Sequence, residues 1–451
     1  MAQTANFKAE ASKATPLLAP VLEVAWAGAG YGTKRYTSVG AGSMAHESRV
    51  VEAGWGAVEP AISESSSQLG KLQTTVQLAN TDRALDVILM GAYDQRRSPV
   101  TIYRASPNLA EADWDVRFVG IVDGWTFGPG TVTLNLSTDA LKLEGFLPRV
   151  PILKSDFPNA PATSVGIFMP LLFGEFSSAG VTGTGLLQGI PVAWVAGTTG
   201  WYLCCQGIAK AISNVCVNGV LKTLTTHYTV DQAYSAGGRI CTLVKFTAGN
   251  IPVAADVVSF DAQGYTSDGT VGGSLITNPA EIVWTFLDQF VYHDQKTWAG
   301  FGFNKGNAPV DATSFNAVAA LFSRYGIKGA RYLGGTTQQL RAEDVFNESL
   351  ESYQWIRGFW GNDGKLNLTD VLPVHPGYPT ASSVTWDGRQ HEDSVLSFTT
   401  DPIQVRRRTT TSFLDSPKDG RQMFSLDVQD LNVVEDVTVN VAAPWVASKA
   451  T

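Results

Sequence analysis

The stretch from Leu72 to Ser137 carries the clearest alternation of apolar and polar residues in the chain. Leu72–Leu78 repeats with a period of two, which predicts a half-buried strand. The capping residues Asn80–Asp82 precede an apolar stripe at helical spacing, and Gly91 follows where a left-handed helix stop is expected. Three antiparallel strands are predicted next, at about residues 99–103, 116–127 and 131–137. The stretch therefore predicts a building block with polar outer faces and no candidate site.

The preceding part of the chain predicts a loosely held polar arm over residues 1–16 and then a hairpin. Its two strands, Val21–Trp26 and Tyr31–Val39, are joined by the glycine-rich turn at residues 28–32. This turn lacks the G-x-G-x-x-G spacing, and no helical pattern follows it. A hairpin turn is therefore expected there instead of a nucleotide-binding loop.

From about residue 141 the regular alternation of apolar and polar residues is lost, because five prolines from Pro148 to Pro170 interrupt any sustained periodicity. This pattern is typical of a domain junction. Short strands then predict a small antiparallel domain, in which Asn218-Gly219 between apolar neighbours is the strongest hairpin signal.

Three helices are predicted after residue 276. The first has Asn278 as its N-cap, the second spans Thr313–Tyr325 with Gly326 as its stop, and the third begins at Thr336 or Thr337. Further strands are predicted at residues 354–360, 365–369, 395–400, 403–413, 423–428 and 437–441. A helix followed by antiparallel strands thus occurs near residues 72–137 and again near 336–413, which indicates an internal duplication of element order.

Composition restricts the classes of function. A chain of 451 residues with 44 glycines and 44% hydrophobic residues predicts about three globular, β-rich domains. The net charge of −8 argues against a protein that grips nucleic acid by its phosphates, although nucleic acid could still slide past such a surface. No signal peptide is recognised, and no apolar window has the length that a membrane helix needs.

The four cysteines show no zinc-site spacing and no disulfide framework, so buried thiols in a protein assembled in a reducing cytoplasm are expected. Cys204 and Cys205 are adjacent, and strand alternation predicts that they face opposite sides.

Catalytic motifs are not found. The five histidines form no metal-binding spacing, and the serine-hydrolase elbow and the phosphate-binding P-loop are absent. Carboxylates gather around two tryptophans without the paired arrangement that glycosidases use; these groups are Glu111, Asp113 and Asp115 beside Trp114, and Asp288 and Asp294 near Trp298. Arg406–Arg408 is expected to be a solvated or interface edge. We therefore expect no enzyme and assign no catalytic, cofactor-binding or metal-binding residue; no cofactor is expected.

The order of several short motifs resembles the baseplate hub, or tail-tip hub, proteins of tailed bacteriophages and related gene transfer agents. The motifs span roughly residues 70 to 370 and are each mostly turn chemistry; they are Val119–Gly124, Pro170–Gly174, Val217–Val220 with Tyr228–Asp231, Leu275–Pro279, and Trp360 with Asp363–Leu366. Their order and spacing together carry the resemblance. The chain departs from the family after about Asp415, where no lysozyme-like or spike module is recognised.

The resemblance implies a mainly β fold with α+β character and two tail-tube-like β-barrels with short helices, separated by a small antiparallel β domain and a helical segment. The corresponding domains are 1–148 (first barrel with the arm), 149–275 (antiparallel β domain) and 276–451 (helical segment with the second barrel). It implies a trimeric virion protein of the tail, assembled in the host cytoplasm, which joins a six-fold tail tube to a three-fold tip and lines the DNA channel.

The partners that the resemblance implies are two further copies, tail-tube and distal tail proteins, a tape-measure protein, and tip or fibre proteins. DNA passes through without sequence-specific binding, and no stable membrane insertion is expected. The alternative is a carbohydrate-binding or glycan-hydrolysing β-rich virion protein, in which Trp114, Trp298 or Trp360 lines a groove.

Overall fold

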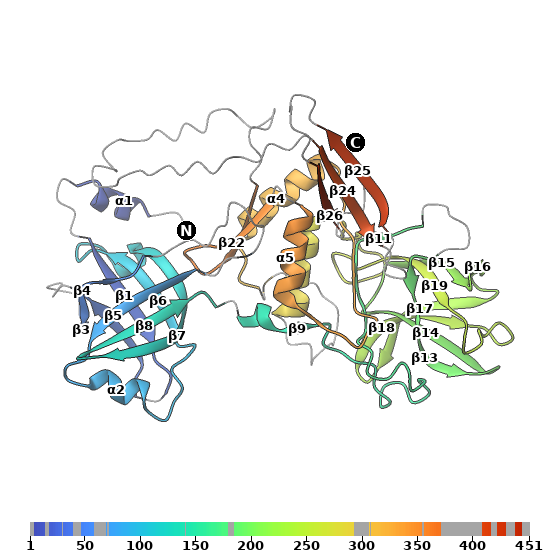
Figure 1. The fold of residues 1–451 in the computed structure, drawn as a ribbon, viewed down its shortest axis with the longest axis horizontal. Helices are drawn as coiled ribbons and strands as arrows, with labels where there is room; N and C mark the ends of the chain where they lie inside the picture. The colour runs from blue at the N-terminus through green and yellow to red at the C-terminus, as the bar shows by residue number, and fades with distance from the viewer. Residues whose placement is uncertain are drawn as a thin grey trace.

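The computed structural model describes residues 4–13, 18–28, 30–38, 47–57, 69, 72–139, 141–178, 185–292, 306, 308–353 and 356–370, together with the backbone of residues 408–415, 422–429 and 438–443. The described chain is mainly β with a few short helices, as predicted. A barrel, a small antiparallel β domain and a set of helices lying between them make up the molecule (Figure 1).

An eight-stranded sheet forms a nearly closed barrel near the N-terminus. Its strands are β1 (Ala19–Ala25), β2 (Thr33–Thr37), β3 (Glu47–Ser48), β4 (Val50–Trp55), β5 (Gln73–Ala79), β6 (Pro99–Ala105), β7 (Asp115–Gly128) and β8 (Thr131–Ser137), paired in the order β3-β2-β1-β6-β7-β8-β5-β4. The two edge strands of this order, β3 and β4, are separated in the chain by Arg49 alone. The two edges of the sheet therefore meet, which removes the exposed strand edges that invite aggregation.

The predicted building block is confirmed as four neighbouring strands, β6-β7-β8-β5, that pair antiparallel. Helix α2 (Ala84–Leu89) follows β5 and buries Leu85, Ile88 and Leu89 in the core. Its start uses Asn80, whose Oδ1 accepts a hydrogen bond from the Leu85 backbone N–H at 3.0 Å. The left-handed residue at this helix is Arg83, with φ 56°, and Gly91 does not have a positive φ. The helix ends just before Gly91, as predicted, but the left-handed conformation predicted for Gly91 is wrong.

The N-terminal arm contains a short helix, in contrast to the loose segment that its polar composition predicts. Helix α1 (Ala5–Ala11) is capped by Thr4, whose hydroxyl accepts from the Phe7 N–H at 3.1 Å. Phe7 is buried, and the Asn6 side chain donates a hydrogen bond to Asp113 in the 3₁₀ turn η1 (Glu111–Asp113). Burial of one aromatic ring against the barrel thus orders this helix.

The middle of the chain folds into two packed antiparallel sheets, which confirms the predicted type of domain. Its strands are β11 (Glu175–Phe176), β12 (Leu187–Gln188), β13 (Ile190–Val195), β14 (Thr199–Gln206), β15 (Ala211–Val217), β16 (Val220–Leu221), β17 (Tyr228–Ala236), β18 (Arg239–Phe246) and β19 (Val258–Gln263), while the preceding β10 (Leu171–Phe173) belongs to a separate pair. One sheet has the order β11-β19-β15-β16 with β12 beside β19, and the other has the order β13-β14-β18-β17. Apolar side chains fill the space between them.

The four-stranded sheet of this domain is buried on both faces, because the proline-containing segment before β10 covers its outer side. Leu203 and Leu243 on the sheet pack against Ile152 and Phe157 of that segment. Alternation predicts opposite faces for Cys204 and Cys205, but both thiols lie in the cluster between the sheets. A β-bulge in the pairing with β18, between Leu203 and Cys205, interrupts the alternation.

Helices follow at the predicted places, with one correction. They are α3 (Pro279–Phe286), continued by the π-helical turn η3 (Leu287–Val291), α4 (Ala312–Arg324) and α5 (Ala342–Ser352). Asn278 caps α3 as predicted, and its Nδ2 also donates to the Ala319 carbonyl of α4 at 2.7 Å. Helix α5 begins six residues or so later than predicted, because β21 (Leu340–Arg341) pairs with β9 (Phe146–Leu147) instead of entering the helix.

Two short pieces complete this part of the chain. The 3₁₀ turn η2 (Leu141–Glu144) precedes β9, and β20 (Arg331–Leu333) pairs with β10. The predicted hairpin after α5 is confirmed as β22 (Ile356–Trp360) and β23 (Leu366–Asp370).

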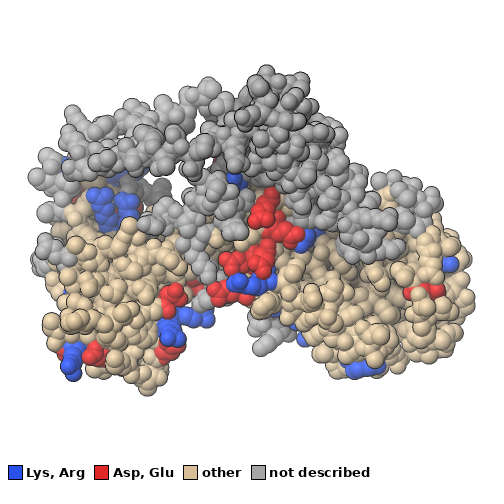
Figure 2. All heavy atoms as spheres, in the orientation of Figure 1, with Lys and Arg blue, Asp and Glu red and all other residues tan. Residues whose placement is uncertain are grey.

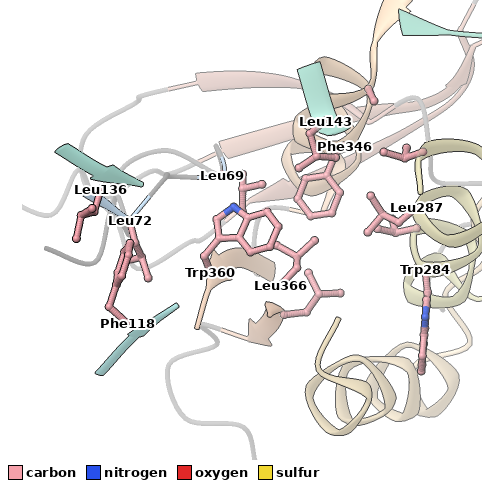
Figure 3. Packing of buried hydrophobic residues seen from close by; sticks show 14 of the residues in the cluster. Leu69, Leu72, Phe118, Leu136, Leu143, Trp284, Leu287, Phe346, Trp360 and Leu366 are labelled. Carbon is pink, nitrogen blue, oxygen red and sulfur yellow. The ribbon is translucent and has the colours of Figure 1, made fainter. Parts of the chain in front are cut away.

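The barrel and the helices share one continuous hydrophobic core. Figure 3 shows Trp360 of β22 between barrel residues, Leu72 and Leu136, and residues of the helices, such as Phe346 and Leu287. Leu72 and Leu136 lie at the end of β5 and β8 that is opposite to α2. One end of the barrel is thus covered by α2 and the other by the helical layer, and apolar side chains fill the barrel interior.

The C-terminal strands form a separate three-stranded sheet, in which β24 (Arg408–Asp415) lies between β25 (Gln422–Gln429) and β26 (Thr438–Ala443). The strand predicted at residues 395–400 lies outside the described residues. Within the described part of the chain, the strands after residue 276 form this sheet, the hairpin β22–β23 and two short pairs. A second barrel therefore remains a prediction, as do the limits of the three domains.

Candidate functional site

The three carboxylates beside Trp114 do not form a catalytic group, because each has a separate structural partner. The two terminal guanidinium nitrogens of Arg35 donate to Glu111, at 2.6 and 2.8 Å. Asp113 accepts from Asn6 of helix α1 at 2.8 Å, and Asp115 forms an ion pair with Arg117 at 2.8 Å. These acids fasten a loop to the barrel.

The tryptophans that a carbohydrate groove would use are buried where they are described. Trp114 packs edge-on against Tyr103, with ring centroids 5.6 Å apart, and the Arg35 guanidinium lies 5.5 Å from its ring centroid. Trp360 belongs to the continuous core. Trp298 lies outside the described residues. Neither described ring offers an open stacking platform for a sugar.

The described residues also hold no metal cluster, since no group of three His, Cys, Asp or Glu side chains converges among them. His227 serves a turn, because its Nδ1 accepts from the Thr223 N–H at 2.9 Å. Asp288 is buried in η3 and accepts from the Ala308 N–H at 2.9 Å. The other four histidines, Asp294, Arg406 and Arg407 lie outside the described residues.

Two cavities adjoin the segment that connects β20 to β21, of about 260 and 400 Å³. Both are lined by Tyr332, Gly334 and Thr336. Arg331 is the charged residue that lines the smaller cavity, and it forms an ion pair with Glu348 of α5. No Asp, Glu, His or Cys lines either cavity. Acid–base chemistry therefore has no residues to carry it there.

The four cysteines, all of them in the described chain, are buried thiols as predicted. Burial raises the pKa of the Cys205 thiol to about 12 and that of Cys204 well above its usual value. Because the thiolate is the reactive species, these side chains are poor nucleophiles at neutral pH. They act as small apolar residues of the core.

The most distinctive surface is a part of the barrel exterior without charge. Outward-facing Gln73, Thr75 and Gln77 of β5 lie beside Thr131, Thr133 and Asn135 of β8, in a register that sets Thr75 opposite Asn135 and Gln77 opposite Thr133. Strand β7 extends this surface with Thr126, which lies opposite Thr133. We call these seven residues the uncharged barrel face. The exposed Asp123, at the bulge of β7, borders this face and is its nearest charge on that strand. Sequence alternation predicted the β5 and β8 parts, whereas the place of Thr126 depends on the bulged pairing of β7 with β8.

The opposite side of the barrel carries ion pairs. Arg35 of β2 bonds Glu23 of β1 at 2.6 Å as well as Glu111. A second ion pair, Arg49 with Asp82 at 2.7 Å, lies at the end of β5 and borders the uncharged barrel face, because Arg49 also donates to the Ala79 carbonyl. Hydrogen bonding from Arg49 holds the pKa of the Asp82 carboxyl far below its usual value. Strands β2 and β8 are four positions apart in either direction around the barrel, so the ion pairs of Arg35 and the uncharged barrel face lie on opposite sides.

Acidic residues collect on the helical layer. Helix α5 carries Glu343, Asp344, Glu348 and Glu351, and Figure 2 shows acidic side chains gathered across the middle of the face that it draws. Basic side chains on that face are scattered, without the continuous stripe that phosphate binding requires (Figure 2). Within the described residues, no helix is long and apolar enough to cross a membrane.

Comparison with known proteins gives little further guidance. No family model matches the sequence, and no curated protein matches it. A chain of a solved structure described as the virion of a native gene transfer agent (GTA) particle is 17% identical, and the similarity covers 57% of this chain and 84% of that chain with a TM-score of 0.25. A TM-score of that size carries no argument about fold or function.

Proposed function

We propose that this protein is a structural protein of a phage-like virion, and more specifically the trimeric hub of a tail tip or baseplate. The observation that carries the proposal is the filled, nearly closed barrel whose core continues into the helical layer. Such a unit keeps its shape under load and offers surfaces instead of a site. The motif order from Val119–Gly124 to Trp360 supports the more specific role by its resemblance to hub proteins.

In this role three copies surround a channel, and tail-tube, distal tail, tape-measure and tip or fibre proteins attach to them. Duplex DNA passes through the channel without specific contacts. A surface suited to this passage avoids clustered Lys and Arg, because phosphate contacts would retain the DNA. The uncharged barrel face meets that requirement, so we propose that it points toward the channel.

Spin labels test this arrangement directly. The buried native thiols, with raised pKa values at Cys204 and Cys205, leave an introduced surface cysteine as the selective labelling site. Thr133→Cys marks the uncharged barrel face, and Thr33→Cys on β2 is the matched control on the opposite side of the barrel.

Pulsed electron paramagnetic resonance on the labelled trimer should give shorter label-to-label distances for Thr133→Cys than for Thr33→Cys. Labels near a three-fold axis lie closer together than labels on the outside of the same ring. The reverse order would refute the proposed orientation of the barrel. If neither variant gives a measurable label-to-label distance and the protein has the mass of a monomer, the trimeric hub itself is refuted.

A further inference from the structure

Large exposed apolar side chains form two main groups within the described residues. One group lies on and after helix α2 and consists of Val87, Met90 and Tyr93, exposed by 64, 67 and 49%. The other lies around the β15–β16 hairpin and consists of Val220, Leu221, Leu224 and Val253, exposed by 59, 48, 50 and 63%. We call them the barrel-end patch and the tip patch. Figure 1 places α2 and β16 at opposite ends of the molecule.

The barrel-end patch is held in a fixed shape. The inner side of α2 is anchored in the barrel core, so its outer side has a set orientation. The Tyr31 hydroxyl donates to the Val87 carbonyl at 3.2 Å. Tyr93 lies so close to Gly28 that a Cβ on that glycine would be 2.6 Å from the Tyr93 ring. A preformed apolar surface of this kind loses little entropy when it binds.

The tip patch is also braced, by one asparagine in a left-handed turn. Asn218 has φ 49°, and its side chain donates to Asp256 at 2.6 Å and accepts from the Val257 N–H at 2.9 Å. The second carboxylate oxygen of Asp256 accepts from the Val253 N–H at 2.7 Å. These bonds tie the hairpin to the loop that carries Val253. They also occupy the acidic group, which leaves the outer surface of the tip apolar.

The two patches match in size and character. Their exposed fractions give each on the order of 300–400 Å² of apolar surface, as large as the largest patch on a typical monomer. Facing one another they would bury about 700 Å² of apolar surface. Because interfaces are about 57% apolar, the full contact with its polar rim would reach about 1,200 Å², the lower limit of a stable interface.

We propose that a second copy of this chain occupies the tip patch, and that the second copy contacts it with its barrel-end patch. Two different patches at opposite ends of one molecule make a head-to-tail contact, which closes into a ring when the rotation between copies allows it. This inference rests on the proposed ring-forming function and identifies the surfaces that join neighbouring copies.

Complementation between variants tests the head-to-tail contact. Val220→Asp/Leu224→Asp blocks the tip patch, and Val87→Asp/Met90→Asp blocks the barrel-end patch. Each double variant alone should require at least about a hundredfold higher protein concentration for half-maximal assembly, since charge is placed in an apolar contact. An equimolar mixture retains one intact pair of surfaces, so mass photometry should detect a dimer of one copy of each variant.

Val271→Asp is the matched control, because Val271 is an exposed apolar residue outside both patches; it should assemble like the wild type. Unchanged circular dichroism and melting temperature establish that the variants fold. Normal assembly of both double variants would overturn the inference while leaving the hub proposal intact. A mixture that stays monomeric would overturn the head-to-tail pairing. If the wild type is a monomer that binds phosphatidylcholine vesicles and the tip variant loses this binding, the tip patch binds lipid, and both proposals are overturned.

Discussion

Trp360 provides the sharpest test of the continuous core. Its ring lies between barrel residues and helical residues (Figure 3), and only 3% of the residue is exposed. Replacing a buried tryptophan with alanine removes its transfer free energy and leaves a cavity, which together cost about 3–5 kcal/mol. This is a large part of the roughly 5–15 kcal/mol that stabilises a typical domain.

Because the core is continuous, Trp360→Ala should weaken the barrel as well as the β22–β23 hairpin. A loss of about 3 kcal/mol accelerates hydrogen exchange roughly a hundredfold, and we expect that increase at the amides of β5 and β8. The indole Nε1 has no hydrogen-bond partner among the described residues. Trp360→Phe loses no hydrogen bond there and leaves a smaller cavity than alanine does, so it should cost less than Trp360→Ala.

The control is Phe359→Ala on the same strand, because Phe359 is half-buried and points to the other side. This change should leave exchange in β5 and β8 close to the wild-type rate. If Trp360→Ala accelerates exchange only in β22 and β23, the barrel and the helices have separate cores, and the reasoning is refuted.

Three further predictions concern individual contacts. Gly120→Ala should destabilise the barrel by about 1–3 kcal/mol in urea unfolding, because the new Cβ would lie 2.2 Å from the Ser137 carbonyl oxygen. The control Gly124→Ala should leave stability unchanged, because no atom lies nearer than 4.0 Å to its new Cβ. Equal effects of the two changes would contradict the packing argument. Asp261→Ala should cost about 2–4 kcal/mol, because the buried carboxylate accepts from the Ser178 N–H and hydroxyl at 2.9 and 2.7 Å; a change below 1 kcal/mol, roughly one ordinary hydrogen bond, would show that the site relaxes. Hydrogen bonds from Lys13 and then Asn108 lower the pKa of Glu10 below its ordinary 4.5, so its contribution to stability is present above that pH and lost as the pH falls through the lowered value. The protection factor of the Phe7 amide, which corrects exchange for its intrinsic pH dependence, should therefore fall in acid, and Glu10→Gln should remove that fall.

The sequence was sufficient wherever local pattern and tertiary contact agree. Strand β5, the strands of the building block and the cap at Asn278 follow from alternation and capping chemistry. Those signals act over a few residues, and the surrounding structure supports them.

Contacts between distant residues explain the wrong or missed predictions. Thr336 and Thr337 are good capping residues, but the pairing of β21 with β9 draws the following residues into a strand. Helix α1 depends on burying Phe7 against the barrel, which a polar, alanine-rich composition does not announce. The closure of the barrel depends on β3 and β4 joining opposite edges. A strand is predicted at Arg49–Glu52, which overlaps β4, but the two residues of β3 leave no periodicity to detect.

The candidate surfaces followed the same division. Alternation in β5 and β8 predicted polar outer faces, whereas the separate partners of Glu111, Asp113 and Asp115 are visible only in the fold. The two apolar patches could not be predicted, because Val87 and Val220 resemble core residues in the sequence. Only the fold shows that α2 uses its other side for the core and that β16 lies at a sheet edge.

Electron microscopy of the purified full-length chain tests the central claim most directly. The account predicts three copies in a ring around a central channel, with one barrel of each copy beside the channel. A stable monomer at micromolar concentration, which also fails to form a ring when mixed with its tail-tube protein, would contradict it.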